Sequence, residues 1–439
     1  MTFAQANSIS KENFRTELIL LKSQLENNHA NLYLYHDAKE LDLLIDSISS
    51  SLDTRIDILE AYHHVSYIAA YIQDGHALVY PSDRVLKQFY NEGPLFPLDL
   101  FYNGLELNLI ADYSNENSIP IGSEIKTING TSVDKLYDFM VHHIPRDGKN
   151  LQYPTHVFYK FFSAYYSFFF GFIDSFEIEY LDSNQELKTK NIKALPRNAI
   201  RKRREEKGHI AKEAISFNID VENQLAVLKI ATFDNNILKD DFHQEFKKEI
   251  KSAFKNIRKR KIDNLVIDLR DNQGGELSNG NYLLKQISNR KIKSIYKLEG
   301  LKIDKNTNQR LLKKKINFDK FNFLPWTKSY NGQIFLFTNG GSFSCSAIVA
   351  NEFQKQKLGM IIGEMSGGSA SVNGGSPNEI ITLPYTKIIF TIPTIRFYLN
   401  KNLSIQAKGV IPDVVVKDNY ERFIGGVDKY LDEVMILIK

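Results

Sequence analysis

The sequence predicts a mixed α/β protein in three successive parts: a helical region at residues 1–90, a small β-rich module at 91–195 and an α/β core at 210–439. Three observations support this prediction. Apolar residues first recur with a helical period, then with a strand period, and then alternate between the two. The chain has 439 residues, too many for one ordinary domain. Its 43% hydrophobic and 12% aromatic content is enough to bury a sizeable core.

The first part is expected to be mostly helical, because apolar residues recur three and four positions apart between residues 11 and 72. From about residue 95 to 180 the pattern instead favours short strands, in LELNLIADYS, GSEIKTING and FEIEYLDSN. An Asn-Gly turn at 129–130 leads into a helix that Ser132 or Asp134 could cap. These features predict a small β-rich module after the helices.

From about residue 215 onward, apolar strands alternate with helical patterns. The expected strands are LAVLKIATF, NLVIDLR, GQIFLFT, GMIIGE and KIIFTIPT, and the expected helices cover 240–258, 280–287 and 345–357. Strands of this kind joined through helices predict a parallel sheet covered on both faces. Sites in such sheets form at the carboxyl ends of the strands, which DNQGGE and GGSFSCSA directly follow.

The charge and cysteine content exclude several classes of function. The net charge is only +4, and the one dense basic run, RKRREEK at 201–207, is interpreted as a solvated linker, so no nucleic-acid partner is expected. The single cysteine, Cys345, excludes an intrachain disulfide framework and a Cys-rich zinc site. The start of the chain lacks an apolar signal region, but TFAQA resembles the tail of a cleaved bacterial signal. We therefore expect an exported protein of the periplasm or cell envelope.

The most apolar stretch, residues 158–173, contains Lys160 and is shorter than the roughly 20 residues that a membrane-spanning helix needs. It is interpreted as an aromatic core or inter-domain helix, with a membrane-surface segment as the alternative. No integral membrane span is expected.

Three serines follow a glycine pair in TNGGSFSCSA at 338–347. A serine hydroxyl becomes a useful nucleophile only with a base within reach and donors for the oxyanion. Ser344 is best placed, because a helix that begins just after it would aim the Cys345 N–H and the positive end of the helix dipole toward it. The alternative is that Ser344 only caps this helix, a contribution of about 1 kcal/mol.

A second glycine pair ends NLVIDLRDNQGGE at 264–276. Glycines let backbone amides approach a ligand closely. The amides of Gly275 and Cys345 together would form a two-donor oxyanion hole, although the glycine pair could also serve only to turn the chain.

Four segments of the second half, in order, resemble the signatures of the C-terminal-processing (tail-specific) serine peptidases and their tricorn-core relatives. They are NLVIDLRDNQGG, FTNGGSFSCSAIVANEF, GMIIGEMSGGSA and KGVIPDVVV. The helical start and PIGSEIKTINGTSV are similar to the family's N-terminal modules, the latter to its PDZ domain. The resemblance implies a crotonase/ClpP-like catalytic core and peptide-bond hydrolysis, with no metal or organic cofactor.

Carried over residue by residue, the resemblance makes Ser344 the nucleophile and places the oxyanion donors at Gly275 and Cys345. The family's Ser-Ala-x-Glu pattern reads Ser344-Cys345-Ser346-Ala347, so its acidic position holds Ala347. The processing peptidases carry a lysine base twenty-five residues after the serine, where this chain has Ser369. A Ser–Lys dyad is therefore not expected.

The tricorn-like branch supplies a histidine base from the N-terminal half, and YIQDGHALVYPS is similar to its Asp-x-His element. This makes His76 the implied general base, with an ordinary pKa near 6.5 that suits proton transfer at neutral pH. His63 and His64 lie on a helical pattern, and His142 and His143 precede a Pro-Arg-Asp loop. Without the resemblance, His76 would be read as an ordinary turn histidine.

A third group should orient the histidine. The tricorn-like branch has a glutamate shortly before its Gly-Val-x-Pro-Asp element, where this chain has Gln406. A glutamine can orient an imidazole but cannot offset the imidazolium charge, which implies either a slower enzyme or a different orienting group. Glu364, Glu276 and Asp74 are the other candidates.

The resemblance implies a serine endopeptidase acting on extended polypeptides, such as unfolded chains or exposed C-terminal tails. The β-rich module would present an edge strand or a carboxylate-binding nest to such a peptide. Two alternatives are a non-catalytic relative that binds peptides or an apolar ligand, and an esterase or acyl transferase on a similar sheet. The absence of a G-x-S-x-G elbow around Ser344 counts against an α/β-hydrolase.

Overall fold

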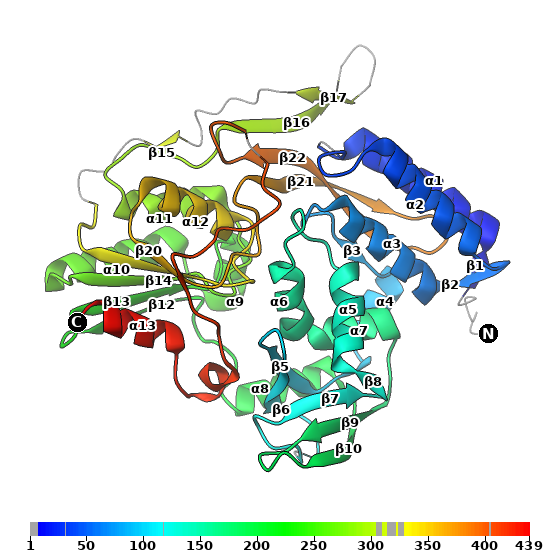
Figure 1. The fold of residues 1–439 in the computed structure, drawn as a ribbon, viewed down its shortest axis with the longest axis horizontal. Coiled ribbons are helices and arrows are strands. Elements are labelled where there is room, and N and C mark those ends of the chain that lie inside the picture. Colours follow the sequence, from blue (N-terminus) through cyan, green and yellow to red (C-terminus); the bar gives the residue numbers. More distant parts are fainter. Residues whose placement is uncertain are drawn as a thin grey trace.

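The computed structural model describes residues 8–30, 32–116, 118–303, 310–313, 322–323, 329–403 and 405–439. Helices and several β-sheets alternate along them, which confirms the predicted α/β fold (Figure 1). The N-terminal helices lie against β21 and β22, the middle sheet lies below them in the figure, and the largest parallel sheet lies on the opposite side of the molecule.

Three helices and a two-stranded sheet form the start of the chain, as the apolar spacing predicts: β1 (Ser8–Ser10), α1 (Lys11–Asn28), α2 (Ala38–Ser51), β2 (Arg55–Asp57) and α3 (Ile58–Ile72). The Ser10 hydroxyl accepts the Asn13 N–H at the start of α1, and Asp37 and Glu40 form a capping box on α2. Helix α3 ends at Gln73, whose φ of 59° is left-handed. That residue turns the chain sharply, so residues 74–78 leave the helix as a separate loop.

The middle part forms a sheet with the strand order β10-β9-β7-β6-β5, and β8 pairs with β7. Its elements are β5 (Leu98–Tyr102), β6 (Leu107–Asp112), β7 (Glu124–Ile128), β8 (Thr131–Ser132), α5 (Val133–His143), β9 (Ser175–Leu181) and β10 (Leu187–Lys193). Asn129 and Gly130, at φ 50° and 72°, make the predicted tight turn between β7 and β8. Ser132 is the residue before α5, but its side chain makes no capping hydrogen bond.

The aromatic stretch forms two helices, α6 (Gln152–Lys160) and α7 (Phe162–Phe170), which are separated at Phe161. Their aromatic side chains join one continuous hydrophobic cluster that also contains side chains of α1–α3 and of the middle sheet. The core interpretation of this segment is therefore correct. Within the part of the chain that the structure describes, no helix combines the length and apolar character needed to span a bilayer.

The two outer strands of the middle sheet are poorly suited to pairing with a peptide. Strand β10 exposes Lys188, Lys190 and Lys193 along its length, a feature that discourages strand addition. Strand β5 is largely buried and is packed by α6. Among the described strands, β10 pairs only with β9, so the capture of a peptide at an edge of this module stays a prediction.

The basic run is not a linker, because it lies in α8 (Arg197–Glu206) and ties that helix to the middle sheet. Arg203 donates to the carbonyl of Tyr113, Arg204 pairs with Asp99, and Lys207 donates to the carbonyl of Asp112. The remaining short elements of this half are β3 (Val79–Tyr80), α4 (Asp83–Tyr90), β4 (Pro94–Leu95) and β11 (Leu195–Pro196).

The C-terminal part is built on a six-stranded sheet with the order β12-β13-β14-β19-β20-β23, parallel from β13 onward. Its strands are β12 (Ile215–Asp220), β13 (Leu225–Ile230), β14 (Asn264–Asp268), β19 (Gln333–Thr338), β20 (Met360–Gly363) and β23 (Val414–Val415). Helices α10 (Phe246–Arg260), α11 (Leu277–Ile287) and α12 (Cys345–Gln356) share a core with one face of it. Helix α13 (Lys429–Leu437) covers the other face (Figure 1).

Two sequence-based predictions in this part are wrong in detail. The single helix expected at 240–258 is two helices, α9 (Asn235–Phe242) and α10, because His243 is left-handed and turns the chain between them. The segment KIIFTIPT, expected in the parallel sheet, belongs to β22 (Ile389–Tyr398) of a separate antiparallel sheet. That sheet also contains β3, β16 (Lys297–Ile303), β17 (Arg310–Lys313) and β21 (Val372–Thr382), while β15 (Ile292–Lys293) pairs with β18 (Asn322–Phe323).

These two sheets together position the candidate residues. The parallel strands β14, β19 and β20 end at one edge, so the loops at 269–276, 339–344 and 364–370 lie side by side there. The N-terminal half reaches this edge because β3, two residues after Ala77, pairs with β22. The 3₁₀ helix η2 (Tyr420–Ile424) completes the described elements and packs against β6.

Candidate active site

Ser344 occupies a strained position between β19 and α12. Its φ of 52° and ψ of −118° lie outside the regions that non-glycine residues favour, a conformation that costs about 1–3 kcal/mol. Ser344 is the residue before the helix, but its hydroxyl makes no capping hydrogen bond. The simple capping role is therefore not what this side chain does.

The Ser344 hydroxyl instead meets His76, which lies 268 residues earlier in the chain. The Oγ of Ser344 and the Nε2 of His76 are 3.1 Å apart. The His76 ring packs on Phe343 with ring centroids 4.9 Å apart, and Phe343 in turn stacks on Tyr153 at 4.1 Å. Gly75 allows this approach, since a Cβ there would lie 2.7 Å from the Phe343 ring. The aromatic stack fixes the imidazole over the serine.

The other two serines of the loop have different surroundings. The Ser342 hydroxyl donates to the carbonyl of Leu269 at 2.8 Å and accepts the N–H of Asn339 at 3.1 Å, so it holds the loop to the end of β14. The Ser346 hydroxyl is buried inside α12 and has no hydrogen-bond partner among the described residues. Only Ser344 has a base within hydrogen-bonding distance.

The glycine loop after β14 lies directly against the serine. A Cβ on Gly274 would lie 2.8 Å from the Cβ of Ser344 and 2.9 Å from the Cys345 nitrogen, so only glycine fits there. The Gly274 N–H is already donated to the side chain of Asn272. The amides of Gly275 and Cys345 make no hydrogen bond within the described part of the chain. Both predicted donors are thus free and lie on either side of the Gly274–Ser344 contact.

Asp74 is the acidic group beside His76. It is buried, its Oδ1 accepts the backbone N–H of His76 at 3.0 Å, and the same oxygen lies 3.7 Å from the His76 Nδ1. Its Oδ2 accepts a hydrogen bond from Arg396 at 2.9 Å and lies 3.3 Å from the Nε2 of His29. The carboxylate therefore joins the histidine turn to an arginine of β22.

The pKa values in this cluster follow from burial and these contacts. Burial opposes ionisation of Asp74, but His29, His76 and Arg396 outweigh it and hold the pKa of Asp74 well below its ordinary value. Burial also opposes protonation of His76, yet the Asp74 carboxylate raises the pKa of His76 above its ordinary value. Burial lowers the pKa of His29, which is therefore neutral near pH 7. The site thus favours an ionised Asp74 and a readily protonated His76.

A second buried carboxyl, Asp147, braces the same turn. It accepts the Gly75 N–H at 2.9 Å through one oxygen and the Ser369 N–H at 3.0 Å through the other. Burial raises the pKa of Asp147 to about 6, against the opposing pull of His76. Ser369, which stands where the processing peptidases carry lysine, thus helps to hold the histidine turn through its amide.

The structure does not bring the Gln406 side chain to His76. That side chain is exposed and lines a shallow hollow with Tyr296, Lys355 and Asn400, while the Gln406 backbone bonds to Ser371. None of the hydrogen bonds among the described residues joins Gln406 to His76. Gln406, which occupies the position of the family's glutamate, therefore does not orient His76 in this structure.

Of the other three candidates for orienting His76, only Asp74 contacts it. Glu276 accepts the N–H of Asn235 instead. Glu364 lies near Asp418, where burial and that neighbouring charge raise its pKa to about 7.

Asp74, His76 and Asp147 are also the group of described residues compact enough to share a cation, with ligand atoms within 4.8 Å of one another. Their oxygens are already committed, because Arg396 pairs with Asp74 and two amides bond to Asp147. The arrangement therefore resembles a proton-transfer site more than a metal centre.

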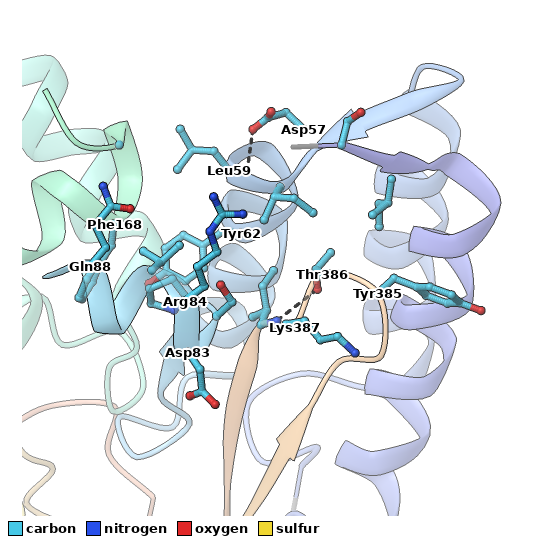
Figure 2. Close-up of a pocket in the computed structure, with 18 of the residues that line it drawn as sticks. Asp57, Leu59, Tyr62, Asp83, Arg84, Gln88, Phe168, Tyr385, Thr386 and Lys387 are labelled. Carbon is cyan, nitrogen blue, oxygen red and sulfur yellow. Dashed lines mark hydrogen bonds between the residues drawn. The ribbon is translucent and has the colours of Figure 1, made fainter. Parts of the chain in front are cut away.

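A separate hollow of about 680 Å³ lies between α3, α4, α7 and the turn that joins β21 to β22 (Figure 2). Tyr62, Arg84, Phe168 and Lys387 are among its walls, and Figure 2 shows the Arg84 side chain directed toward Tyr62. Neither Ser344 nor His76 lines it. The candidate chemistry is located at the edge of the parallel sheet and not in this hollow.

The comparisons with known proteins agree with this geometry. The model of peptidase family S41 matches residues 224–416, the region that contains both glycine loops and Ser344. This part of the chain belongs to peptidase family S41. The chain therefore carries a serine-type peptidase domain. No curated protein matches the chain.

Solved structures extend the likeness to the whole fold. Mature CPAF superposes with a TM-score of 0.72 at 14% identity, covering 98% of this chain and 97% of that one. Mature CPAF complexed with lactacystin gives 0.71 at 14% identity, with 98% of both chains covered. The photosystem II D1 C-terminal processing protease is more distant, with a TM-score of 0.46 at 14% identity over 92% of this chain and 93% of that one. At 14% identity the CPAF structures show the fold of this chain and nothing further.

Sequence reasoning missed three residues of the site: Arg396, Asp147 and His29. Each lies in a segment with an ordinary apolar or loop pattern, far from the recognisable loops. One signal was present for Asp147, in the unusual Pro-Arg-Asp-Gly loop, but a single sequence gives it no partner.

Proposed function

We propose that the chain is a serine endopeptidase in which Ser344 is the nucleophile and His76 the general base. The observation that carries this proposal is the 3.1 Å contact between the Ser344 Oγ and the His76 Nε2. That distance lies within the range needed for proton transfer to a base. Unfolded polypeptides or exposed C-terminal tails are the proposed substrates.

In the first step, the Ser344 Oγ attacks the carbonyl carbon of the scissile peptide bond while its proton passes to the His76 Nε2. The tetrahedral intermediate collapses as His76 returns this proton to the leaving amine nitrogen. A water molecule then attacks the acyl-enzyme, with His76 again accepting and returning a proton. Each proton taken from a nucleophile is delivered to a leaving group, so His76 ends each turnover neutral.

The free amides of Gly275 and Cys345 would stabilise the oxyanion of both tetrahedral intermediates. They flank the close Gly274–Ser344 contact, and Cys345 begins α12, whose positive dipole end adds to their effect. The strained Ser344 backbone supports the proposal because it keeps the hydroxyl out of the helix cap and beside the base.

Asp74 would take over the role of the family's glutamate. Its ionised carboxylate lies 3.7 Å from the His76 Nδ1 and favours the imidazolium that forms during the reaction. At this distance its contribution is mainly electrostatic and not a short hydrogen bond. The loss of the glutamate at position 406 therefore does not by itself make the site inactive.

Labelling with a fluorophosphonate tests the proposal directly. The parent protein is expected to form one covalent adduct on Ser344, located by peptide mass mapping, while Ser344→Ala forms none. His76→Ala should react at least about a hundredfold more slowly, because the hydroxyl loses its base. Cleavage of unfolded casein should follow the same order.

Ser346→Ala is the matched control, since it removes a hydroxyl two residues away that has no hydrogen-bond partner among the described residues. Its labelling rate should equal that of the parent. A Ser344→Ala variant that still degrades casein would exclude this site as the peptidase centre, and a parent that binds peptides without labelling would indicate a non-catalytic relative.

A further inference from the structure

A groove of about 500 Å³ lies along the same edge of the parallel sheet as Ser344, beyond the ends of β20 and β23. The active-site chemistry described above does not use it. Its walls come from three segments: Lys149–Gln152 before α6, Glu364 and Met365 after β20, and residues between Ala407 and Lys417 around β23.

The position of the groove follows from the strand order β14-β19-β20-β23. The Gly275 loop follows β14, Ser344 follows β19, and the groove follows β20 and flanks β23. The loop at 364–370 connects the active site to the groove. Its Gly368 N–H donates to the Ser342 carbonyl on the side of the active site, and its Ser366 N–H donates to the Val410 carbonyl on the side of the groove. Two strand spacings are about 10 Å, which is the span of about three residues of an extended peptide.

The walls of the groove carry apolar side chains that the fold leaves in contact with solvent. Ile411 is 55%, Val415 70% and Leu151 36% exposed, and Met365 and Pro412 lie beside them. Single exposed apolar residues are common. Three exposed apolar side chains in one hollow, with little polar surface between them, are typical of a site that binds an apolar group. The volume suits one or two side chains of a peptide.

Lysines surround this apolar floor. Lys149, Lys408 and Lys417 all line the groove, are exposed and form no ion pair within the described part of the chain. The one carboxyl in the wall, Glu364, is half-buried, and burial raises its pKa to about 7, so near neutral pH it offsets less than one of the three lysine charges. The groove therefore combines an apolar floor with unpaired positive charge.

We propose that this groove is an exosite for the substrate, which binds an apolar side chain together with one or more carboxylates about three residues from the scissile bond. The carboxylate could be a neighbouring Asp or Glu side chain or the free C-terminus of the substrate. This inference rests on the proposed peptidase function and adds a substrate preference to it.

The test uses the full chain as the Ser344→Ala variant, so that binding is measured without cleavage. Its probes are fluorescent peptides with one Leu flanked by Glu, with either a free or an amidated C-terminus, and the same peptides with Gln in place of Glu. Fluorescence anisotropy should show at least about tenfold tighter binding for a peptide that carries a carboxylate than for the amidated Gln peptide. The two C-terminal forms separate the two sources of the carboxylate.

The groove variant replaces Lys149, Lys408 and Lys417 by Gln, and it should lose this preference. The matched control replaces Lys247, Lys251 and Lys255 on α10 by Gln, which changes the net charge equally on a distant exposed helix face. That control should bind the peptides as tightly as the parent. A Val415→Asn variant tests the apolar floor, and it should weaken binding of the Leu peptide but not of the same peptide with Ser in place of Leu.

Equal weakening by both triple variants would show that only net charge matters and would overturn the exosite. Equal affinity for the amidated Gln peptide and for every peptide that carries a carboxylate would also overturn it. In the active protein, the groove variant should raise KM for the acidic peptide with little change in kcat. Failure of the fluorophosphonate to label Ser344 while the groove still selects acidic peptides would instead refute the proposed catalysis alone.

Discussion

The nucleophile loop at 338–345 and the base turn at 73–77 meet in one site but are held by different forces. The nucleophile loop depends mainly on hydrogen bonds between uncharged groups, such as those from Ser342 to the Leu269 carbonyl and from the Phe343 N–H to the Asn272 carbonyl. Among the described residues, its one bond to a charged group is that of the Asn339 amide to the Asp271 carboxylate. The base turn depends on buried charges, with Asp74 paired to Arg396 and Gly75 bonded to Asp147.

This difference has a physical consequence. A neutral hydrogen bond contributes about 1 kcal/mol and hardly responds to pH. A buried ion pair contributes little net stability when complete, but removing one partner leaves an expensive uncompensated charge. The base turn should therefore be the more sensitive half of the site, both to substitution and to pH.

Asp74→Asn should have the largest effect. The amide is almost the same size, so the shape of the turn is kept while the negative charge between His76 and Arg396 is lost. We expect kcat/KM to fall at least about a hundredfold, and stability in urea to fall by about 3–5 kcal/mol, because Arg396 loses a buried counter-charge. The acid limb of the pH profile should move to lower pH, since burial without Asp74 lowers the pKa of His76.

The double variant Asp74→Asn with Arg396→Met provides the control for charge. It should recover much of the lost stability, because neither charge remains, but should not recover activity. If the double variant is no more stable than Asp74→Asn alone, the two residues do not act as a compensating pair.

The nucleophile loop could be predicted from the sequence because its position follows from local sequence pattern. Ser344 and the Gly274–Gly275 pair follow adjacent strands of one parallel sheet, and apolar strands followed by glycine loops are a local pattern. The base turn could not be completed in this way. Arg396 is 322 residues from Asp74, and no local pattern reports which buried charges will meet.

The fold, too, could be predicted only where local pattern decides it. The helices of the first part and the strands β14, β19 and β20 follow their periodicity, and the structure confirms them. The sheet to which β22 belongs could not be predicted, because its apolar run suits any buried strand. The left-handed His243 that divides α9 from α10 likewise has no glycine to mark it.

Ser342→Ala should have an intermediate effect on stability and little effect on pH dependence. The substitution removes the acceptor of the buried Asn339 N–H, which should cost about 1–3 kcal/mol of unfolding free energy, while the Leu269 carbonyl still accepts the Asn272 N–H. The pH profile of kcat/KM should keep its shape, because no charge is altered. A shifted acid limb in this variant would contradict the division between a neutral loop and a charged turn.

Asp147→Asn should have the smallest effect and tests the direction of the electrostatics. The negative charge of Asp147 helps to raise the pKa of His76, so its removal should move the acid limb of kcat/KM to lower pH, by less than about one pH unit. The Asn carbonyl oxygen can still accept one of the two amides, so kcat should fall only a few-fold.

The same substitution also changes how stability depends on pH. Because the folded pKa of Asp147, about 6, exceeds its unfolded value, its ionisation destabilises the parent as pH rises from about 4 to 6. That decline should be weaker in Asp147→Asn when urea midpoints are compared across this range. An acid limb that moves upward, or an unchanged decline, would mean that Asp147 braces the turn only through its hydrogen bonds to Gly75 and Ser369.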